Sequence, residues 1–268
     1  MWLVKLLLFL AGAYALVALL IYVTQSALLF PTRMVGAAPP LPPAAERLRV
    51  EAPGGETLHG AHIPPSRPAA GERLAIIGFG GNAWNADAVA LFLHELYPQA
   101  DVVAFHYRGY RPSTGAPTAA ALLADAPLLH DHVAARLGAR RIVAVGFSVG
   151  SGVAARLARE RPLAGLILVT PFDSLAAVAG RHYPWLPVRL LFRHEMPAAR
   201  DLRSVRVPVA LIAAGHDSLI PPHHAQALAE EVPNLVLDRT IPGAGHNDIY
   251  RHPAFQTAMR DALARIEG

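Results

Sequence analysis

The chain has 268 residues, of which 53% are hydrophobic and 16% are charged, and this composition excludes an intrinsically disordered protein. The formal net charge is +4, but Lys5 is the only lysine and the arginines are scattered. Such scatter indicates a solvated basic surface, or a modest attraction to anionic lipid head groups, rather than a nucleic-acid site. The absence of cysteine excludes disulfides, a thiolate nucleophile and cysteine zinc sites.

The amino end carries an apolar run from Leu6 to Val23 without a single charge. At about 1.5 Å per residue, a helix of this length nearly spans a bilayer core. Trp2 and Tyr22 stand near its ends, where aromatic residues gather at membrane interfaces. We expect a transmembrane anchor. A cleaved signal peptide is the alternative, although the run is long for one and no good small-x-small cleavage site follows it.

Few charges flank this run: Lys5 and the terminal amine on one side, Arg33 on the other. The positive-inside rule then favours a single-pass protein whose main domain is non-cytoplasmic, which in a bacterium is the periplasm. We expect an anchor over residues 1–30, a stiff Pro-rich spacer over 31–46 and one globular domain over 47–268.

The remainder reads as a β-hairpin followed by alternating strands and helices. Residues 48–51 and 57–63 predict the hairpin. Apolar runs predict strands over 74–79, 102–107, 142–147, 166–169, 209–213 and 236–241. Spacing near 3.6 predicts helices over 87–96, 119–137, 149–159, 225–232 and 253–266. This order predicts an α/β fold with a mostly parallel sheet covered on both faces. The stretch Arg181–Arg200 fits neither pattern and is interpreted as a small insertion over the site.

The predicted strand over 142–147 runs into Gly146-Phe147-Ser148-Val149-Gly150, a G-x-S-x-G sequence, and then into a helix. In such a sharp turn the serine hydroxyl stands clear, and glycines on either side let the neighbouring backbone approach. The helix N-terminus behind it favours developing negative charge. We predict that Ser148 is a nucleophile; a Gly-rich turn with an incidental serine is the alternative.

A serine nucleophile needs a general base and an acid that orients the base, in the chain order Ser, Asp or Glu, His. Asp217 follows the predicted strand over 209–213, and His246 follows the one over 236–241. Ligands bind at the carboxyl ends of parallel strands, so both residues lie where the chemistry requires them. We predict Asp217 as the acid and His246 as the base, with Asp248 and Asp173 as reserve candidates for the acid.

Non-catalytic roles remain open for these residues, because the chain has 13 histidines. His246 on a solvated loop and Asp217 as a helix cap are both open. The nearby His216, His223 and His224 do not predict a metal site, since adjacent histidines on a helix point to different faces and no carboxylate pair recurs at ligand spacing. We expect neither a metal nor a cofactor.

An oxyanion hole needs two backbone N–H groups directed at the substrate oxygen. We expect one from Val149, the residue after the nucleophile. The other is expected from the Gly-rich loop 78–85, for which a flexible turn is the alternative.

Together these motifs resemble the membrane-anchored α/β-hydrolases of the yeast bud-emergence type and the mammalian α/β-hydrolase domain-containing proteins 13 and 17. The matching segments cover nearly the whole chain: the N-terminal helix, SALLFPTR from Ser26, Gly80-Gly81-Asn82-Ala83, the loop 107–115 (YRGYRPSTG), the serine elbow, Asp217 with Ile220-Pro221, and Gly245-His246-Asn247. The resemblance implies a serine hydrolase of the α/β-hydrolase fold acting on acyl esters or thioesters at a membrane.

The chain departs from this family twice. Gly80 stands where the family has His, and Arg111 stands where it has Gly. The first departure removes a side chain that would brace the oxyanion loop, but it leaves the backbone donor, which we assign to Asn82.

The sequence therefore predicts acyl transfer by Ser148, His246 and Asp217, with the N–H groups of Val149 and Asn82 holding the oxyanion. A site near a bilayer meets lipid acyl esters, small esters or acylated proteins as substrates. A serine peptidase is the nearest alternative, because the same triad cleaves amides. A non-enzymatic membrane-anchored binding protein is the other; such proteins commonly lose a triad member, and this chain keeps all three.

Overall fold

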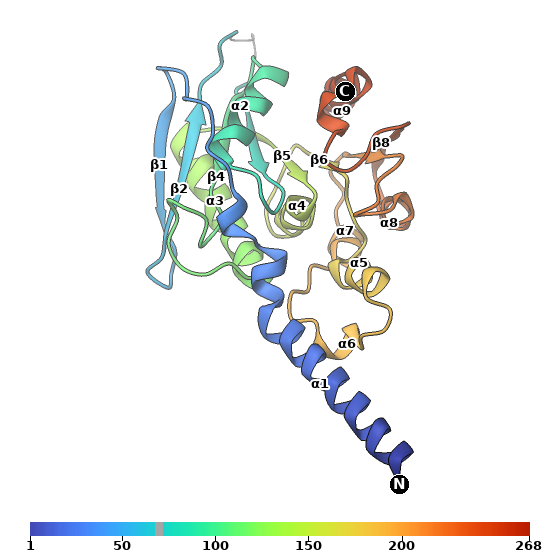
Figure 1. Ribbon diagram of the computed structural model, residues 1–268. Helices are drawn as coiled ribbons and strands as arrows, with labels where there is room; N and C mark the ends of the chain where they lie inside the picture. The colour runs from blue at the N-terminus through green and yellow to red at the C-terminus, as the bar shows by residue number, and fades with distance from the viewer. Residues whose placement is uncertain (68–71) are drawn as a thin grey trace.

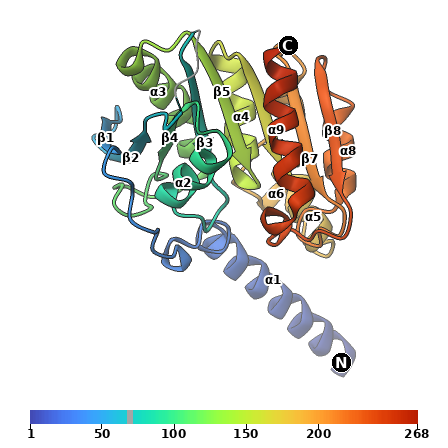
Figure 2. The same cartoon turned by 90° about the horizontal axis from the view of Figure 1, so that it is seen from above.

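The computed structural model describes residues 1–67 and 72–268 and contains one eight-stranded sheet in the order β1-β2-β4-β3-β5-β6-β7-β8. Helices cover both faces of the sheet, and a long N-terminal helix projects away from it (Figure 1). The view from above shows the same two helical layers (Figure 2). The predicted α/β fold with a mostly parallel sheet is confirmed.

The strands follow the predicted apolar runs closely. They are β1 (Glu46–Glu51), β2 (Thr57–Ile63), β3 (Leu74–Phe79), β4 (Asp101–Phe105), β5 (Arg141–Phe147), β6 (Gly165–Val169), β7 (Val209–Ala214) and β8 (Leu235–Ile241). The hairpin β1–β2 and the pair β2–β4 are antiparallel, and the other neighbours pair in parallel. β3 to β7 are buried on both faces, which explains their unbroken apolar sequences.

The helices build the two outer layers. They are α1 (Trp2–Leu29), α2 (Ala86–Leu96), α3 (Ala119–Leu137), α4 (Val149–Glu160), α5 (Leu175–His182), α6 (Val188–Leu191), α7 (Ala198–Leu202), α8 (Pro222–Ala229) and α9 (Pro253–Glu267), with short 3₁₀ turns η1 (Thr32–Met34) and η2 (Ile249–Arg251). One core cluster lies under α3, α4 and α7, and the other under α2 and α9. The side chains of Asn85, Thr118 and Ser174 cap α2, α3 and α5 by accepting backbone N–H groups.

Three predicted elements differ from the structure by two residues or more at a boundary, and the first is β1, which begins at Glu46 rather than at Leu48. α8 begins at Pro222 and ends at Ala229, earlier than the predicted 225–232, because a proline ring suits the first turn of a helix. β4 ends at Phe105, two residues before the predicted Tyr107, whose side chain instead reaches the loop after β3.

α1 is long and apolar enough to cross a membrane, and most of it is exposed to solvent. A membrane span and a signal sequence both have this character. The end of α1 is nevertheless built into the domain: Gln25 is buried, and Phe30 belongs to the hydrophobic core. The chain then runs to β1, which begins at Glu46.

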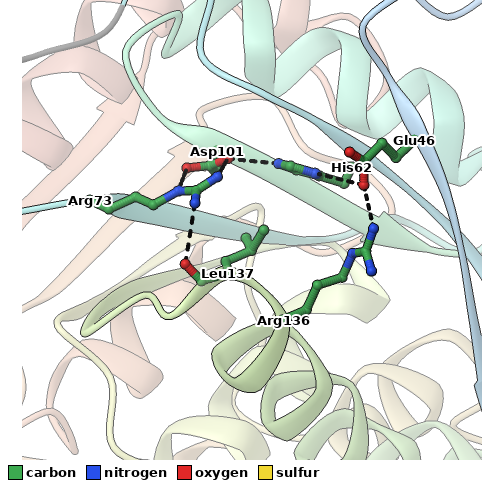
Figure 3. A network of polar contacts seen from close by, with 6 residues as sticks. All are labelled: Glu46, His62, Arg73, Asp101, Arg136 and Leu137. Carbon is green, nitrogen blue, oxygen red and sulfur yellow. Dashed lines mark hydrogen bonds and ion pairs between the residues drawn. The ribbon is translucent and has the colours of Figure 1, made fainter.

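A polar network ties β1, β2 and β4 to α3 (Figure 3). The buried carboxylate of Asp101 on β4 accepts hydrogen bonds from His62 Nε2 at 2.7 Å and from Arg73 Nε and Nη2 at 2.5 and 2.8 Å. Glu46 and Arg136 extend the network to the surface through an ion pair. Burial alone would raise the pKa of Asp101, but the hydrogen bonds from Arg73 and His62 outweigh it and lower the pKa to about 2. Asp101 is therefore a buried, charged carboxylate that holds His62 and Arg73 together inside the fold.

Candidate active site

The turn between β5 and α4 holds Ser148 in a strained backbone conformation, with φ 52° and ψ −119°. Residues other than glycine rarely adopt a positive φ, and they do so where the surroundings enforce it. The flanking glycines are required by contact: a Cβ on Gly146 would overlap the backbone of Gly150, and one on Gly150 would overlap the carbonyl of Phe79. The backbone N–H of Ser148 donates to the carbonyl of Val169 at 2.9 Å. The turn has the geometry that the G-x-S-x-G sequence predicts.

The structure brings Ser148, His246 and Asp217 together at the carboxyl ends of β5, β8 and β7. His246 Nε2 lies 3.0 Å from Ser148 Oγ, and His246 Nδ1 lies 2.6 Å from Asp217 Oδ2. The other oxygen of Asp217 accepts the backbone N–H groups of Leu219 at 2.9 Å and Ile220 at 2.7 Å. These bonds fix the buried carboxylate so that it accepts a hydrogen bond from the imidazole ring, and among the described residues no charged side chain other than His246 is bonded to it.

The two reserve acids lie elsewhere. Asp173 contacts His224 Nδ1 at 2.7 Å, and the exposed Asp248 accepts the backbone N–H of Gly245 at 2.6 Å. Asp248 thus holds the loop in front of His246 rather than its ring. Within the described ranges, no group of three or more His, Asp or Glu side chains is arranged to hold a metal ion.

Asn82 and Val149, the predicted oxyanion donors, line the same cavity as Ser148. Among the described residues, the hydrogen bonds outside regular helices and strands include none donated by the backbone N–H of Asn82 or Val149. Gly81 packs against the nucleophile, since a Cβ there would lie 3.6 Å from Ser148 Cβ. The N–H groups of Asn82, in the loop after β3, and of Val149, at the start of α4, are therefore available to a ligand beside Ser148.

Two tyrosines brace this loop, and no role for them was predicted from the sequence. Tyr107 donates its hydroxyl to the carbonyl of Gly80 at 2.8 Å, and Tyr110 donates to the carbonyl of Asn82 at 2.7 Å. Burial raises the pKa of both phenols, so they stay protonated donors. Both hydrogen bonds hold the loop that carries Gly80, the position at which the resembled family has a histidine. The sequence signal was the loop 107–115 itself, which the resemblance singled out.

An apolar cavity of about 320 Å³ opens at the nucleophile. One wall comes from the last turns of α1, through Ala18, Ile21, Tyr22, Gln25, Leu28 and Leu29. The facing wall comes from α5, α6 and the chain around them, and it includes Tyr183, Leu186, Val188, Leu191 and Phe192. The segment 181–200, interpreted from sequence as an insertion, thus contributes six of its residues to the cavity beside Ser148, His182 being the sixth.

Sequence comparisons identify relatives of this arrangement. A family model described as "alpha/beta hydrolase fold" matches residues 75–201. The uncharacterized protein Rv2307c of Mycobacterium tuberculosis is 35% identical over 211 residues, covering 77% of this chain and 74% of the relative. The lysophosphatidylserine lipase ABHD12 of Xenopus tropicalis is 27% identical over 194 residues, covering 62% of this chain and 50% of the relative. The α/β-hydrolase domain-containing protein 17C of Xenopus tropicalis is 28% identical over 202 residues, covering 74% and 64%.

Comparison with solved structures agrees on the fold. The Pyrococcus furiosus esterase Pf2001 superposes with a TM-score of 0.69, at 20% identity, over 87% of this chain and 97% of the esterase chain. The predicted resemblance to α/β-hydrolase domain-containing proteins is confirmed. The fold and these lipase and esterase neighbours support hydrolase activity. The chain belongs to the α/β-hydrolase family.

Proposed function

We propose that this protein is a membrane-anchored serine hydrolase that cleaves acyl esters or thioesters through an acyl-enzyme intermediate. The observation that carries the proposal is the unbroken hydrogen-bonded line Ser148–His246–Asp217, with an apolar cavity at the serine end. A structural serine would need neither a base at 3.0 Å nor a strained turn that presents its hydroxyl to a cavity.

The proposed reaction has two halves. Ser148 Oγ bonds to the acyl carbon while His246 Nε2 takes the hydroxyl proton, and Asp217 holds the ring and stabilises the imidazolium. The N–H groups of Asn82 and Val149 hold the oxyanion. Collapse breaks the bond to the leaving alcohol or thiol, which receives the proton from His246. Water then attacks the acyl carbon and gives a proton to His246; the bond to Ser148 Oγ breaks, His246 returns the proton to Oγ, and the acid leaves.

The lining of the cavity favours an acyl chain as the group that is bound. Its walls are mostly aliphatic and aromatic, and such surfaces bury hydrocarbon favourably. A peptide substrate would bring backbone polar groups that need partners, which makes the peptidase alternative less suited to this cavity. ABHD12 is named a lysophosphatidylserine lipase, which also points to a lipid ester. Acylated proteins share the same chain chemistry and stay among the proposed substrates.

Anchoring is part of the proposal, with an anchor over 1–30, a spacer over 31–46, a hydrolase domain over 47–268, and the domain on the non-cytoplasmic side. Burial of Gln25 and Phe30 supports retention of the helix over cleavage as a signal peptide, because removal would strip residues from the core and the cavity wall. If the anchor is retained, the purified protein has the mass of the uncleaved chain and stays in the membrane pellet after carbonate extraction. A shortened soluble product would contradict it.

Labelling by a fluorophosphonate probe tests the nucleophile. The wild type is expected to label, and Ser148→Ala is expected to lose labelling and at least about 10³-fold of its turnover of p-nitrophenyl acetate. Ser204→Ala, an exposed serine outside the site, is the matched control and is expected to behave as the wild type. Equal labelling of Ser148→Ala and wild type, or no labelling of an active preparation, would refute the assignment.

A further inference from the structure

The last turns of α1 are bonded to the domain at positions far apart in the sequence. Gln25 Nε2 donates to the carbonyl of Leu191 at 3.1 Å, and Gln25 Oε1 accepts the N–H of Arg193 at 2.9 Å. The carbonyl of Leu29 accepts from Asn82 Nδ2 at 3.2 Å, so the helix end is tied to the oxyanion loop. α1 is therefore a fixed part of the site and not a loose tether.

The cavity follows one face of α1 away from the nucleophile. Ala18, Ile21, Tyr22, Gln25 and Leu29 recur at intervals of one, three and four residues, which keeps them on one side of a helix. From Leu29, beside the oxyanion loop, to Ala18 the helix rises about 16 Å. An extended acyl chain whose carbonyl lies at Ser148 would run along this face.

Charged and aromatic groups mark where a bilayer would meet α1. The guanidinium of Arg193 lies 4.6 Å from the centre of the Tyr22 ring, an arrangement suited to the head-group level. From Tyr22 to Trp2 the helix rises about 30 Å, which equals the thickness of a hydrocarbon core. Tyr22 and Trp2 would then lie at the two interfaces.

The segment Tyr183–Leu191, called here the cap segment, lies beside the middle of α1 (Figure 1). Tyr14 donates its hydroxyl to the carbonyl of Trp185 at 3.0 Å, and the two rings pack edge to face at 6.3 Å. Tyr14 lies about 12 Å further along the helix than Tyr22, on the side of the bilayer interior. The contact therefore places part of the cap segment below the level of Arg193.

The cap segment also has the surface of an immersed element. The side chain of Leu190 is 84% exposed and that of Trp185 is 49% exposed, although both are strongly apolar. Large exposed apolar groups gathered on one side of a protein are typical of a membrane contact. The only charge in the segment is Arg189, and long basic side chains of this kind extend to the head groups.

We propose that the cap segment is immersed in the adjacent leaflet, and that α1 and the cap segment form a channel which takes the acyl chain of a membrane lipid ester sideways from the bilayer to Ser148. The proposal rests on the proposed function and deepens it, because it makes α1 a determinant of substrate chain length. Ala18, Ile21 and Tyr22 are then specificity residues within the membrane helix.

Immersion is tested without reference to catalysis. The chain has no cysteine, so Leu190→Cys gives a unique site for an environment-sensitive fluorophore. In phosphatidylcholine vesicles with brominated acyl chains, the label at position 190 is expected to lose most of its emission. Arg140→Cys, in an exposed loop before the amino end of β5, is the matched control and is expected to keep its emission. Equal emission from the two labels would overturn immersion.

Chain selectivity tests the wall formed by α1. Ala18→Trp fills the far part of the channel, whereas Ala27→Trp places the same ring on the opposite, exposed face of the helix. The ratio of kcat/KM for p-nitrophenyl palmitate over p-nitrophenyl acetate is expected to fall about tenfold or more in Ala18→Trp and to stay at the wild-type value in Ala27→Trp. An unchanged ratio in Ala18→Trp, or the same fall in both variants, would overturn the channel.

The source of the chain is tested with the wild type. Lysophospholipid embedded in vesicles is expected to be hydrolysed, and a soluble S-palmitoylated peptide is expected to be the poorer substrate. The reverse preference would contradict a lipid source. Failure of the proposed function gives a different pattern. The wild type would then not hydrolyse either p-nitrophenyl ester and would not react with the fluorophosphonate, whatever emission the label at position 190 shows.

Discussion

Two of the histidine–aspartate pairs in the described part of the chain are almost completely buried and nearly equal in geometry, and one of these two faces a nucleophile. His246 Nδ1 is 2.6 Å from Asp217, and His62 Nε2 is 2.7 Å from Asp101. All four side chains are almost completely buried. Distance and burial alone therefore do not separate a catalytic pair from a structural one.

The partners on either side make the difference. Asp101 also accepts from the guanidinium of Arg73, whose positive charge neutralises the carboxylate (Figure 3). Apart from His246, the partners of Asp217 among the described residues are two neutral backbone N–H groups, so its negative charge is left to stabilise an imidazolium. The second ring nitrogen of His246 meets the hydroxyl of Ser148. A catalytic pair therefore differs from a structural one in the groups that contact the second ring nitrogen and the second carboxylate oxygen.

The largest loss of activity is expected from Asp217→Asn. The amide keeps the shape of the side chain but no longer fixes the tautomer or stabilises the imidazolium, so turnover of p-nitrophenyl acetate is expected to fall about 10⁴-fold. Circular dichroism is expected to show an unchanged fold. Asp248→Asn serves as the control, with a much smaller loss because that side chain supports only the loop. An unchanged rate in Asp217→Asn would move the acid to Asp248 or Asp173.

Asp101→Asn examines the structural pair. Its loss leaves Arg73 and His62 without their charged acceptor, at an expected cost of about 2–3 kcal/mol in the free energy of unfolding. The thermal midpoint in detergent is expected to fall by roughly 5–10 °C. Hydrolysis by the folded protein at 25 °C is expected to stay within a few-fold of wild type. A loss of turnover as large as that of Asp217→Asn would refute the assigned difference between the pairs.

Low pH is expected to remove the stabilising effect of Asp101. The pKa of Asp101 is lowered from its usual 3.8 to about 2, so its contribution to stability is complete above pH 4 and is lost as the pH falls toward 2. The loss amounts to roughly 2 kcal/mol. Denaturant titrations of wild type and Asp101→Asn are expected to differ at pH 6 and to converge near pH 2. A difference that is the same at both pH values would contradict the linkage.

The smallest effect is expected at a third pair. Asp173 contacts His224 at 2.7 Å, but no hydrogen bond among the described residues links this pair to Ser148. Asp173→Asn is therefore expected to change kcat/KM for p-nitrophenyl acetate by no more than about twofold. A steady-state assay beside Asp217→Asn checks it. A loss above tenfold would show that this pair acts on the site.

The sequence was sufficient for the sheet and for the three predicted catalytic side chains because each carries a local signal. Buried strands read as continuous apolar runs, and Ser148 sits in a motif whose glycines are needed by close backbone contact. Asp217 and His246 were found from topology, since both follow strands of one parallel sheet. Their roles stay predictions until the variants are measured.

The tyrosine hydrogen bonds to the loop after β3, and the cavity, could not be predicted from the sequence because they depend on contacts between distant segments. The hydroxyl of Tyr110 donates to the carbonyl of Asn82, 28 residues earlier in the chain. The side chain of Gln25 donates to the carbonyl of Leu191, 166 residues later. The pairing of Gln25 with Leu191 leaves no periodic or motif signal, and the motif over 107–115 does not reveal which atom Tyr110 contacts. Composition alone likewise gave the segment 181–200 no secondary structure, although α6 and the loops around it pack over the cavity.

The hydrogen bond between Asn82 and the carbonyl of Leu29 has a consequence for how such a chain can diverge. It pins the rotation of α1, so inserting one residue between Tyr22 and Gln25 would turn everything before it by about 100° and swing Ala18 away from the cavity. A simple tether tolerates added or lost residues. This helix has a register to keep, as a strand does within a sheet.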